Sequence, residues 1–282
     1  MDKLMTNKEF VEKAIDIANN FKTLYVMGCF GAPMTASNKK RYCNNNSYNK
    51  DVKRQKMINN ASSDTFGFDC VCLIKGILWG WNGNLNHVYG GAAYAKNIAD
   101  LSIATMTGKN YSNGNSSNFT NLAIGELLYI GTGHIGIYIG DGLAVECTPA
   151  WKNKVQITAV GNIGPKEGYP TRMWDKHCKA NFIDYVEDAK IVEPTKPSSS
   201  SDNFLGSRGY IKLGDRGSNV EKIAKFMYKT FPAYTSKAAL GNYYGPNIQK
   251  SIKEFQTRTG LEPDGCVGPL TLKMLVKYGF KY

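Results

Sequence analysis

Residues 193–202 read Glu-Pro-Thr-Lys-Pro-Ser-Ser-Ser-Ser-Asp and contain no large apolar side chain. Such a segment cannot bury enough surface to offset the entropy of ordering, so we expect residues 193–203 to be a flexible Pro/Ser linker. It divides the chain of 282 residues into an N-terminal part, residues 1–192, and a C-terminal part, residues 204–282. The length agrees with about two domains of ordinary size.

Composition excludes several protein classes. Apolar residues make up 42 % of the chain and charged residues 21 %, which excludes disorder throughout. The most apolar stretch, residues 122–140, is interrupted by Glu126, His134 and several glycines, so we expect no insertion into a membrane. The N-terminus lacks the apolar segment of a secretory signal. We therefore expect synthesis in the cytoplasm without a signal peptide, and free thiols rather than disulfides at the cysteines.

The net charge of +12 is concentrated in the C-terminal part, where 13 Lys and Arg residues stand against 5 Asp and Glu residues. A basic domain suits a polyanionic partner, either nucleic acid or an anionic cell wall. Charge alone fits equally well a surface that only keeps the protein soluble.

The N-terminal part begins with a predicted helix. Thr6 and Glu9 have the spacing of a capping box, and the apolar residues that follow recur on one helical face. Residues 34–65 are polar and rich in Asn and Lys, so we expect a long loop with little regular structure. From Cys70, apolar residues at helical spacing predict a second, mostly buried helix that ends near Trp79.

Strands are expected later in this part. Residues 126–130 have a β-like composition, and residues 134–139 alternate strictly. Gly140-Asp141-Gly142 predicts a hairpin turn, with strands at 143–148 and 155–160 after it. Helices followed by antiparallel strands indicate an α+β domain.

The C-terminal part is predicted to be a small all-α domain of three helices. Apolar residues at helical spacing mark residues 220–231, and a second helix has Pro246 near its first turn and Gly260 just past its end. Residues 269–278 form the third predicted helix.

Cys70 is the first candidate for chemistry, because it stands at the predicted start of a buried helix. Backbone N–H groups and the helix dipole at such a position stabilise a thiolate, lower the pKa of the thiol and can hold an oxyanion. Buried core cysteines are, however, commonly inert. Position alone leaves both interpretations open.

His134 and Glu146 are the candidates for a base and its orienting group. The alternation places His134 on the face opposite the isoleucines, between glycines, as a general base that faces a cleft requires. If Gly140-Asp141-Gly142 forms a three-residue loop, Glu146 shares that face as a diagonal neighbour about 7 Å away. A two-residue loop would turn Glu146 to the other face. Taken singly, each is also compatible with an ordinary exposed side chain.

A zinc site is a competing interpretation of the cysteines. Cys70 and Cys72 are separated by one residue, whereas structural zinc sites use roughly two to four. We therefore expect no metal and no other cofactor. His87 and His177 have no recognisable partners in the sequence and are expected in surface or loop positions.

Four stretches together resemble a known family: residues 24–28, Phe68-Asp69-Cys70, residues 133–142 and Val145-Glu146. They are similar to the NlpC-type cell-wall cysteine peptidases, a papain-like α+β fold related to the CHAP amidohydrolases. The resemblance covers most of residues 8–160. It implies Cys70 as the nucleophile, His134 as the base and Glu146 as the residue that orients His134.

The same resemblance implies contacts with substrate. Tyr25 would sit beside the thiol near the oxyanion, and Asp69 directly precedes the nucleophile. Trp151 follows the third site residue and offers an aromatic wall to a peptide or a sugar, with a core position as the alternative. We therefore expect Tyr25, Asp69 and Trp151 to bind substrate, and the 34–65 insertion to rim the groove.

The C-terminal part carries a separate resemblance. Residues 213–220, Tyr244-Gly245-Pro246-Asn247, Phe255-Gln256 and residues 264–271 are similar to the three-helix peptidoglycan-binding domain, over nearly all of residues 208–276. Bacterial peptidoglycan is therefore the expected partner, in preference to nucleic acid.

Together the two resemblances imply a modular peptidoglycan hydrolase of the phage endolysin type, which acts on the wall after release from the cell. Its expected reaction is cleavage of an amide bond in the stem peptide by thiol nucleophilic catalysis. An N-acetylmuramoyl-L-alanine amidase with the same three residues is the first alternative, because a Glu in third position is closer to the CHAP branch. A non-catalytic wall-binding protein is the second.

Overall fold

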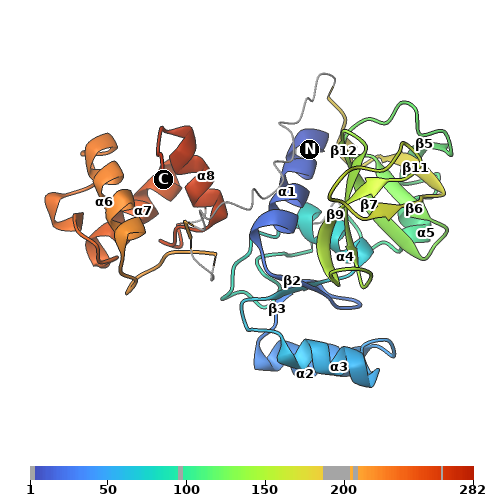
Figure 1. Cartoon of the computed structure of the whole chain (residues 1–282), viewed down its shortest axis with the longest axis horizontal. Coiled ribbons are helices and arrows are strands. Elements are labelled where there is room, and N and C mark those ends of the chain that lie inside the picture. Colours follow the sequence, from blue (N-terminus) through green and yellow to red (C-terminus); the bar gives the residue numbers. More distant parts are fainter. Residues whose placement is uncertain (1–3, 95–97, 187–203, 206–208, 262) are drawn as a thin grey trace. The chain divides into compact units, whose positions relative to one another are not determined.

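The computed structural model describes residues 4–94, 98–186, 204–205, 209–261 and 263–282 (Figure 1). The chain divides into two compact units, Met1–Pro197 and Ser198–Tyr282, here called the N-terminal and C-terminal units. The predicted linker, residues 193–203, lies outside the described residues. In the part of the chain that the structure describes, none of the helices is long and apolar enough to cross a bilayer.

The N-terminal unit is a mixed α+β structure. Its helices are α1 (Asn7–Asn20), α2 (Ala36–Asn45), α3 (Val52–Asn60), α4 (Cys70–Leu78) and α5 (Ile103–Met106). Its strands are β1 (Met5–Thr6), β2 (Thr23–Tyr25), β3 (Phe30–Pro33), β4 (Phe66–Phe68), β5 (Ser112–Ser116), β6 (Leu127–Ile130), β7 (His134–Gly140), β8 (Leu143–Thr148), β9 (Lys154–Val160), β10 (Thr171–Arg172), β11 (Lys176–Ala180) and β12 (Ile183–Asp184).

Within the described residues, the main sheet has seven strands in the order β10-β9-β8-β7-β6-β11-β5. Its pairs are antiparallel except for β10, which runs parallel to β9. A smaller sheet, β2-β4-β3, and a short parallel pair, β1-β12, accompany it. The antiparallel strands predicted around residues 126–160 are thus confirmed, whereas the smaller sheet has no counterpart in the prediction.

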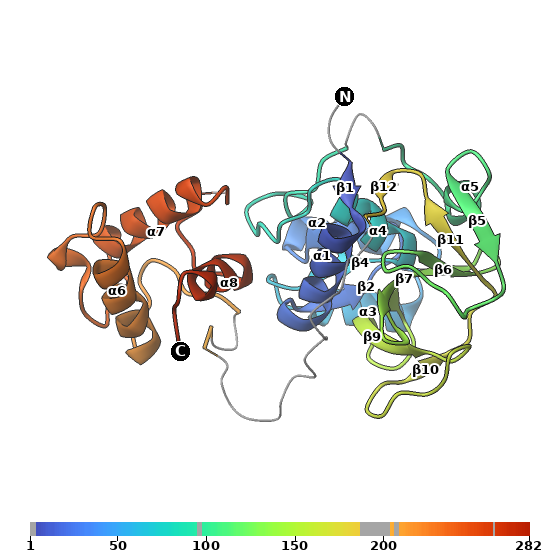
Figure 2. The ribbon, with the colours of Figure 1, turned by 90° about the horizontal axis from the view of Figure 1, so that it is seen from above.

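The core lies between the main sheet and two helices. Helices α1 and α4 pack against each other and against β7 and β8 (Figures 1 and 2). On β7, Ile135, Ile137 and Ile139 are fully buried on this side, as the alternation predicts. Helix α1 begins with the predicted capping box, in which Thr6 and Glu9 bond each other's backbone N–H. Both helices and the central strand therefore follow the pattern of the sequence.

The expectation of an irregular 34–65 insertion is wrong, because it contains α2 and α3. Thr35 caps α2 and Asp51 caps α3, so both helices begin with a side chain that satisfies backbone N–H groups. Asn49, fully buried between them, bonds both the N–H and the C=O of Met27 at 3.1 and 2.8 Å. A small separate cluster then packs the insertion onto the domain, formed by Val26, Cys29, Ala32, Met34, Tyr42, Cys43 and Ile58.

The C-terminal unit contains α6 (Ser218–Thr230), the 3₁₀ turn η1 (Lys237–Ala239), α7 (Pro246–Arg258) and α8 (Pro269–Lys277). The three predicted helices are confirmed, and α7 and α8 both begin with proline at the first turn. The side-chain amide of Gln256, on α7, bonds the Gly265 N–H at 2.8 Å and the Cys266 C=O at 2.9 Å. This buried amide therefore fixes the loop that leads into α8.

Candidate active site

Cys70 is the first residue of α4, and Asp69 fixes its position. One Asp69 carboxylate oxygen accepts the Cys72 N–H at 2.7 Å, and the other accepts the Gly28 N–H at 2.7 Å. The Asp69 side chain is buried, so it joins the start of α4 to the loop after β2. In this structure the Asp69 carboxylate therefore holds the protein's own backbone.

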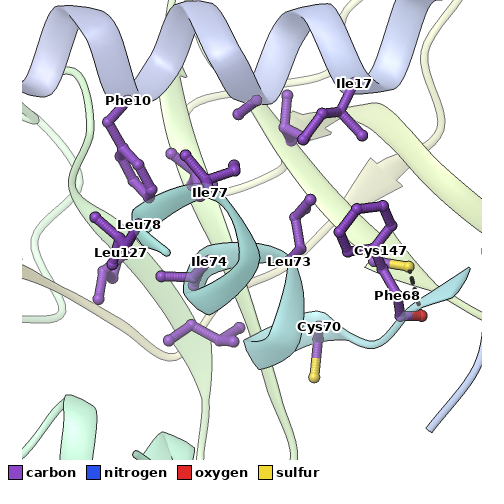
Figure 3. Close-up of a cluster of buried hydrophobic side chains, with 14 of the residues drawn as sticks. Phe10, Ile17, Phe68, Cys70, Leu73, Ile74, Ile77, Leu78, Leu127 and Cys147 are labelled. Carbon is purple, nitrogen blue, oxygen red and sulfur yellow. Dashed lines mark hydrogen bonds between the residues drawn. The ribbon is translucent and has the colours of Figure 1, made fainter. Parts of the chain in front are cut away.

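The Cys70 sulfur lies near backbone N–H groups of α4 and β7. In Figure 3 it points away from the apolar side chains that pack α4 against α1. The β7–β8 ladder stops at Ile137 and Val145, and two residues further along β7 the Ile135 N–H lies near enough to the Cys70 sulfur to lower the pKa of the thiol. The N–H groups of Val71 and of Cys70 itself are also near enough to lower the pKa of the thiol. The sulfur therefore lies one peptide unit from His134.

The expected lowering of the Cys70 pKa is wrong. Burial, and after it the negative charge of Asp69, raise the pKa of the Cys70 thiol to about 12, although the three N–H groups act in the opposite direction. Burial, together with the carboxylate that caps the helix, thus outweighs the effect of the helix N-terminus on the thiol. At neutral pH the thiol is protonated, so its chemistry as a nucleophile requires a base.

His134 lies at the start of β7 with its ring held on two sides. Its Nε2 is 2.6 Å from a carboxylate oxygen of Glu146. Its ring stacks on that of Trp174, with 5.5 Å between centroids and 14° between planes. A Cβ atom on Gly136 would lie 2.7 Å from the Trp174 ring, so glycine is needed at this position to admit the indole. The His134 side chain is only 14 % exposed, so the expectation of open space around it is wrong.

Glu146 reaches the face of His134 by a route different from the predicted one. The turn has two residues, Asp141 and Gly142, both with positive φ, and Gly140 pairs with Leu143. A β-bulge at Ile139 then adds one residue to β7 and restores the register that a three-residue loop would produce. Glu146 and His134 consequently lie on the same face as diagonal neighbours.

Glu146 is fully buried and is held by residues that the sequence prediction missed. Arg172 Nε donates to both carboxylate oxygens at 2.8 and 2.7 Å, and the Thr158 hydroxyl donates to one of them at 2.7 Å. Burial opposes ionisation, but the hydrogen bonds from His134 and Arg172 outweigh it and lower the pKa of Glu146. The carboxylate is therefore ionised at neutral pH. Arg172 belongs to β10, a two-residue strand too short to leave a pattern in the sequence.

Tyr25, on β2, lies close to the thiol. Burial, and after it the neighbouring Cys70, raise the pKa of the Tyr25 hydroxyl. Arg54, from the 34–65 insertion, donates to the Tyr25 carbonyl and lies over its ring at 5.5 Å. Tyr48, also from the insertion, meets the same ring edge-on at 5.8 Å. The insertion is thereby attached to the residue beside the candidate nucleophile.

Trp151 is half exposed and adopts a positive φ of 52°, which is unusual for a bulky residue. The Arg172 guanidinium lies 4.8 Å from its ring centroid. The exposure excludes the alternative of a core tryptophan. Trp151 is therefore a surface aromatic that is joined through Arg172 to Glu146.

Other cysteine and histidine residues have structural contacts. The thiol of Cys147 donates to the Phe68 carbonyl at 3.2 Å (Figure 3). His177 is buried in β11 between Glu126 and the Asn118 carbonyl, so the expected surface or loop position is wrong. Among the described residues, no group of three or more His, Cys, Asp or Glu side chains is arranged to hold a metal ion.

Comparison with known proteins assigns the C-terminal unit. The model of the putative peptidoglycan-binding domain matches residues 223–275. A Kitasatospora aureofaciens protein, described as an uncharacterized protein in the bpoA1 3' region, is 36 % identical over 77 residues. That match covers 27 % of this chain and 64 % of the relative, so the chain spans less than two thirds of the relative's length.

Among solved structures, the crystal structure of the SleB N-terminal domain matches 24 % of this chain and 89 % of its own. The identity is 25 % and the TM-score is 0.22. The family match and helices α6, α7 and α8 agree, and the C-terminal unit is therefore a peptidoglycan-binding domain.

Proposed function

We propose that this chain is a peptidoglycan hydrolase whose N-terminal unit is a papain-like cysteine peptidase of the NlpC type. The observation that carries the proposal is the connected set of Cys70, His134 and Glu146. The sulfur lies near the N–H of the residue after His134, and the imidazole bonds Glu146 at 2.6 Å. A nucleophile, a base and an orienting carboxylate are the groups that acyl transfer requires.

The first step is attack by the Cys70 sulfur on a stem-peptide carbonyl. Because Glu146 engages Nε2, His134 accepts the thiol proton on Nδ1 as the carbon–sulfur bond forms. The ionised Glu146 stabilises the resulting imidazolium. The N–H of Cys70, at the start of α4, is the expected donor to the oxyanion.

The second step releases the products. His134 returns its proton to the leaving amine as the carbon–nitrogen bond breaks, which leaves a thioester on Cys70. Water, deprotonated by His134, then attacks the thioester and restores the thiol. Each proton that leaves a nucleophile is thus returned to a leaving group, and the reaction needs no cofactor.

The peptidoglycan-binding domain supports the same function. A second unit that binds the wall raises the local concentration of scissile bonds on an insoluble substrate. Its excess of Lys and Arg, 13 against 5 Asp and Glu, suits the anionic polymers of cell walls. Tyr25 and Trp151 are proposed to contact the substrate near the reacting groups.

The proposal is tested by the masses of fragments released from purified cell walls. A new free amine inside the stem peptide, together with peptides still attached to sugar, is the expected product. Intact stems released from the sugars would instead identify an N-acetylmuramoyl-L-alanine amidase with the same residues. Walls that release no fragments, while they still bind the protein, would refute the proposal in favour of a binding protein.

A further inference from the structure

A cleft of about 790 Å³ opens on the face of the main sheet that carries His134. This volume is within the range of small-molecule sites. The cleft is lined by Tyr138 of β7, by segments 117–122 and 161–163, and by Met173. Nothing in the proposed reaction uses this cleft.

The cleft is connected to the candidate active site through Trp174. The indole of Trp174 covers Gly136 and stacks on His134, so it lies between that histidine and Tyr138 along β7. Asn162, a lining residue, bonds both the N–H and the C=O of Trp174 at 2.9 Å. A ligand that enters the cleft would therefore lie on the same face as the imidazole, beyond the indole.

The lining is uncharged. Its polar side chains are amides and hydroxyls, and its apolar ones include Phe119, Leu122, Ile163 and Met173. None of the described residues that line it is Asp, Glu, Lys or Arg. Ile163 and Met173 are 45 % and 62 % exposed, so apolar surface is available to a ligand.

Such a lining suits a neutral ligand that has hydroxyl groups, acetamido groups and apolar ring faces. Peptidoglycan contains two chemically different parts, a strand of N-acetylated sugars and a stem peptide with carboxylates. Burying an unpaired carboxylate against uncharged side chains is unfavourable. The sugar strand is therefore the part that fits.

We propose that this cleft binds an N-acetylhexosamine of the glycan strand while the stem peptide lies over Cys70 and His134. The inference rests on the proposed function and adds the sugar strand to its substrate. Tyr138 is four residues from His134 on the same strand, about 13 Å along β7. That is the length of about four extended residues, so a sugar held here places the cut inside the stem rather than at the sugar–peptide amide.

The test compares two substrates, a disaccharide–stem peptide and the same peptide without sugar. Asn121→Ala combined with Ile163→Ala removes an amide and an exposed apolar side chain from the cleft. Asn86→Ala combined with Val88→Ala is the matched control, since both residues are exposed and lie outside the cleft.

We expect the cleft variant to raise KM about tenfold for the sugar-bearing substrate, through the loss of one hydrogen bond and one apolar contact, and to leave kcat in place. The peptide without sugar does not reach the cleft, so its KM should be unchanged in the cleft variant. An equal rise for both substrates would show that the cleft receives peptide, and no rise for either would show that it receives no part of the substrate. Both outcomes overturn the inference.

A binding measurement separates this inference from the proposed function. N,N′-diacetylchitobiose is titrated into the full chain carrying Cys70→Ala, alone and combined with each pair of substitutions. Weaker binding with the cleft pair but not with the control pair supports the sugar site, even if the wild-type chain hydrolyses neither substrate. Identical titrations with both pairs would overturn the site, whatever the hydrolytic activity.

Discussion

Arg172→Met removes the cation that holds the buried Glu146 carboxylate. In the wild-type protein both oxygens of Glu146 accept from Arg172 Nε, at 2.7 and 2.8 Å, and the carboxylate has no exposed surface. The substitution keeps most of the side-chain volume and leaves the carboxylate with His134 and Thr158 as partners. Removal of one partner from a buried ion pair destabilises a protein by about 3–5 kcal/mol, because a buried charge loses its compensation.

Lys166→Met is the matched control, since it also removes a cation from a carboxylate. Lys166 pairs with Asp141 at 3.0 Å, but the two side chains are 37 % and 64 % exposed. An exposed pair contributes about 0–1 kcal/mol. The two substitutions should therefore differ by several kcal/mol, although the ion pairs have similar lengths.

The unfolding free energies of the variants are measured by urea denaturation, with tryptophan fluorescence as the signal. All four tryptophans lie in the N-terminal unit, so this signal reports the unfolding of that unit alone. Because the folded-state pKa of Glu146 is lowered, its ionised form stabilises the fold at neutral pH, and this contribution is lost as the pH falls through the titration of the carboxyl. The difference in unfolding free energy between the wild-type protein and Arg172→Met should consequently become smaller in acid. The reasoning would be refuted if Arg172→Met lost no more unfolding free energy than Lys166→Met, or if its loss did not depend on pH.

Three further predictions concern other parts of the chain. Gly136→Ala should displace the indole beside His134 and slow wall hydrolysis at least about tenfold, whereas Gly133→Ala, whose Cβ atom has no neighbour closer than 3.9 Å, should not; equal rates would contradict this account. Alkylation of Cys70, followed by peptide mass mapping, should accelerate throughout the alkaline range, because the pKa of its thiol is raised to about 12; a plateau at neutral pH would show a thiolate instead. Gln256→Ala should speed hydrogen exchange at the Gly265 amide about tenfold or more, since that N–H loses its acceptor; unchanged exchange would show that the amide does not fix the loop.

The sequence predicted the elements whose patterns are long and regular. The alternation in residues 134–139 identified β7 and its buried face, and Thr6 with Glu9 identified the start of α1. The helices of the C-terminal unit were predicted equally well, because glycine and proline mark their ends. In each case a local rule decides the structure, so a single sequence suffices.

The sequence did not predict features that depend on distant residues. Helices α2 and α3 have little apolar periodicity and are held by caps and by the buried Asn49, so their region resembled a loop. Arg172 and Trp174 surround Glu146 and His134 from a short segment that has no pattern of its own. The bulge at Ile139 compensates for a turn one residue shorter than assumed, and its position is not visible in the alternation.

The direction of the Cys70 pKa shift could not be predicted from the sequence either. The sequence predicts that Cys70 starts a helix and shows that Asp69 precedes it. However, the balance between three N–H groups, a carboxylate and burial depends on how closely each approaches the sulfur. That balance raises the pKa instead of lowering it, and the proposed mechanism therefore assigns His134 as the base.

Hydrolysis of purified cell walls by Cys70→Ala, compared with Cys72→Ala, tests the proposed mechanism most directly. Both cysteines are buried at the start of α4, two residues apart, so the two variants share the cost of losing a thiol there. We expect Cys70→Ala to lower the rate of wall hydrolysis by more than about a thousandfold while Cys72→Ala retains it, with both variants still sedimenting with walls. Undiminished hydrolysis by Cys70→Ala would contradict the account.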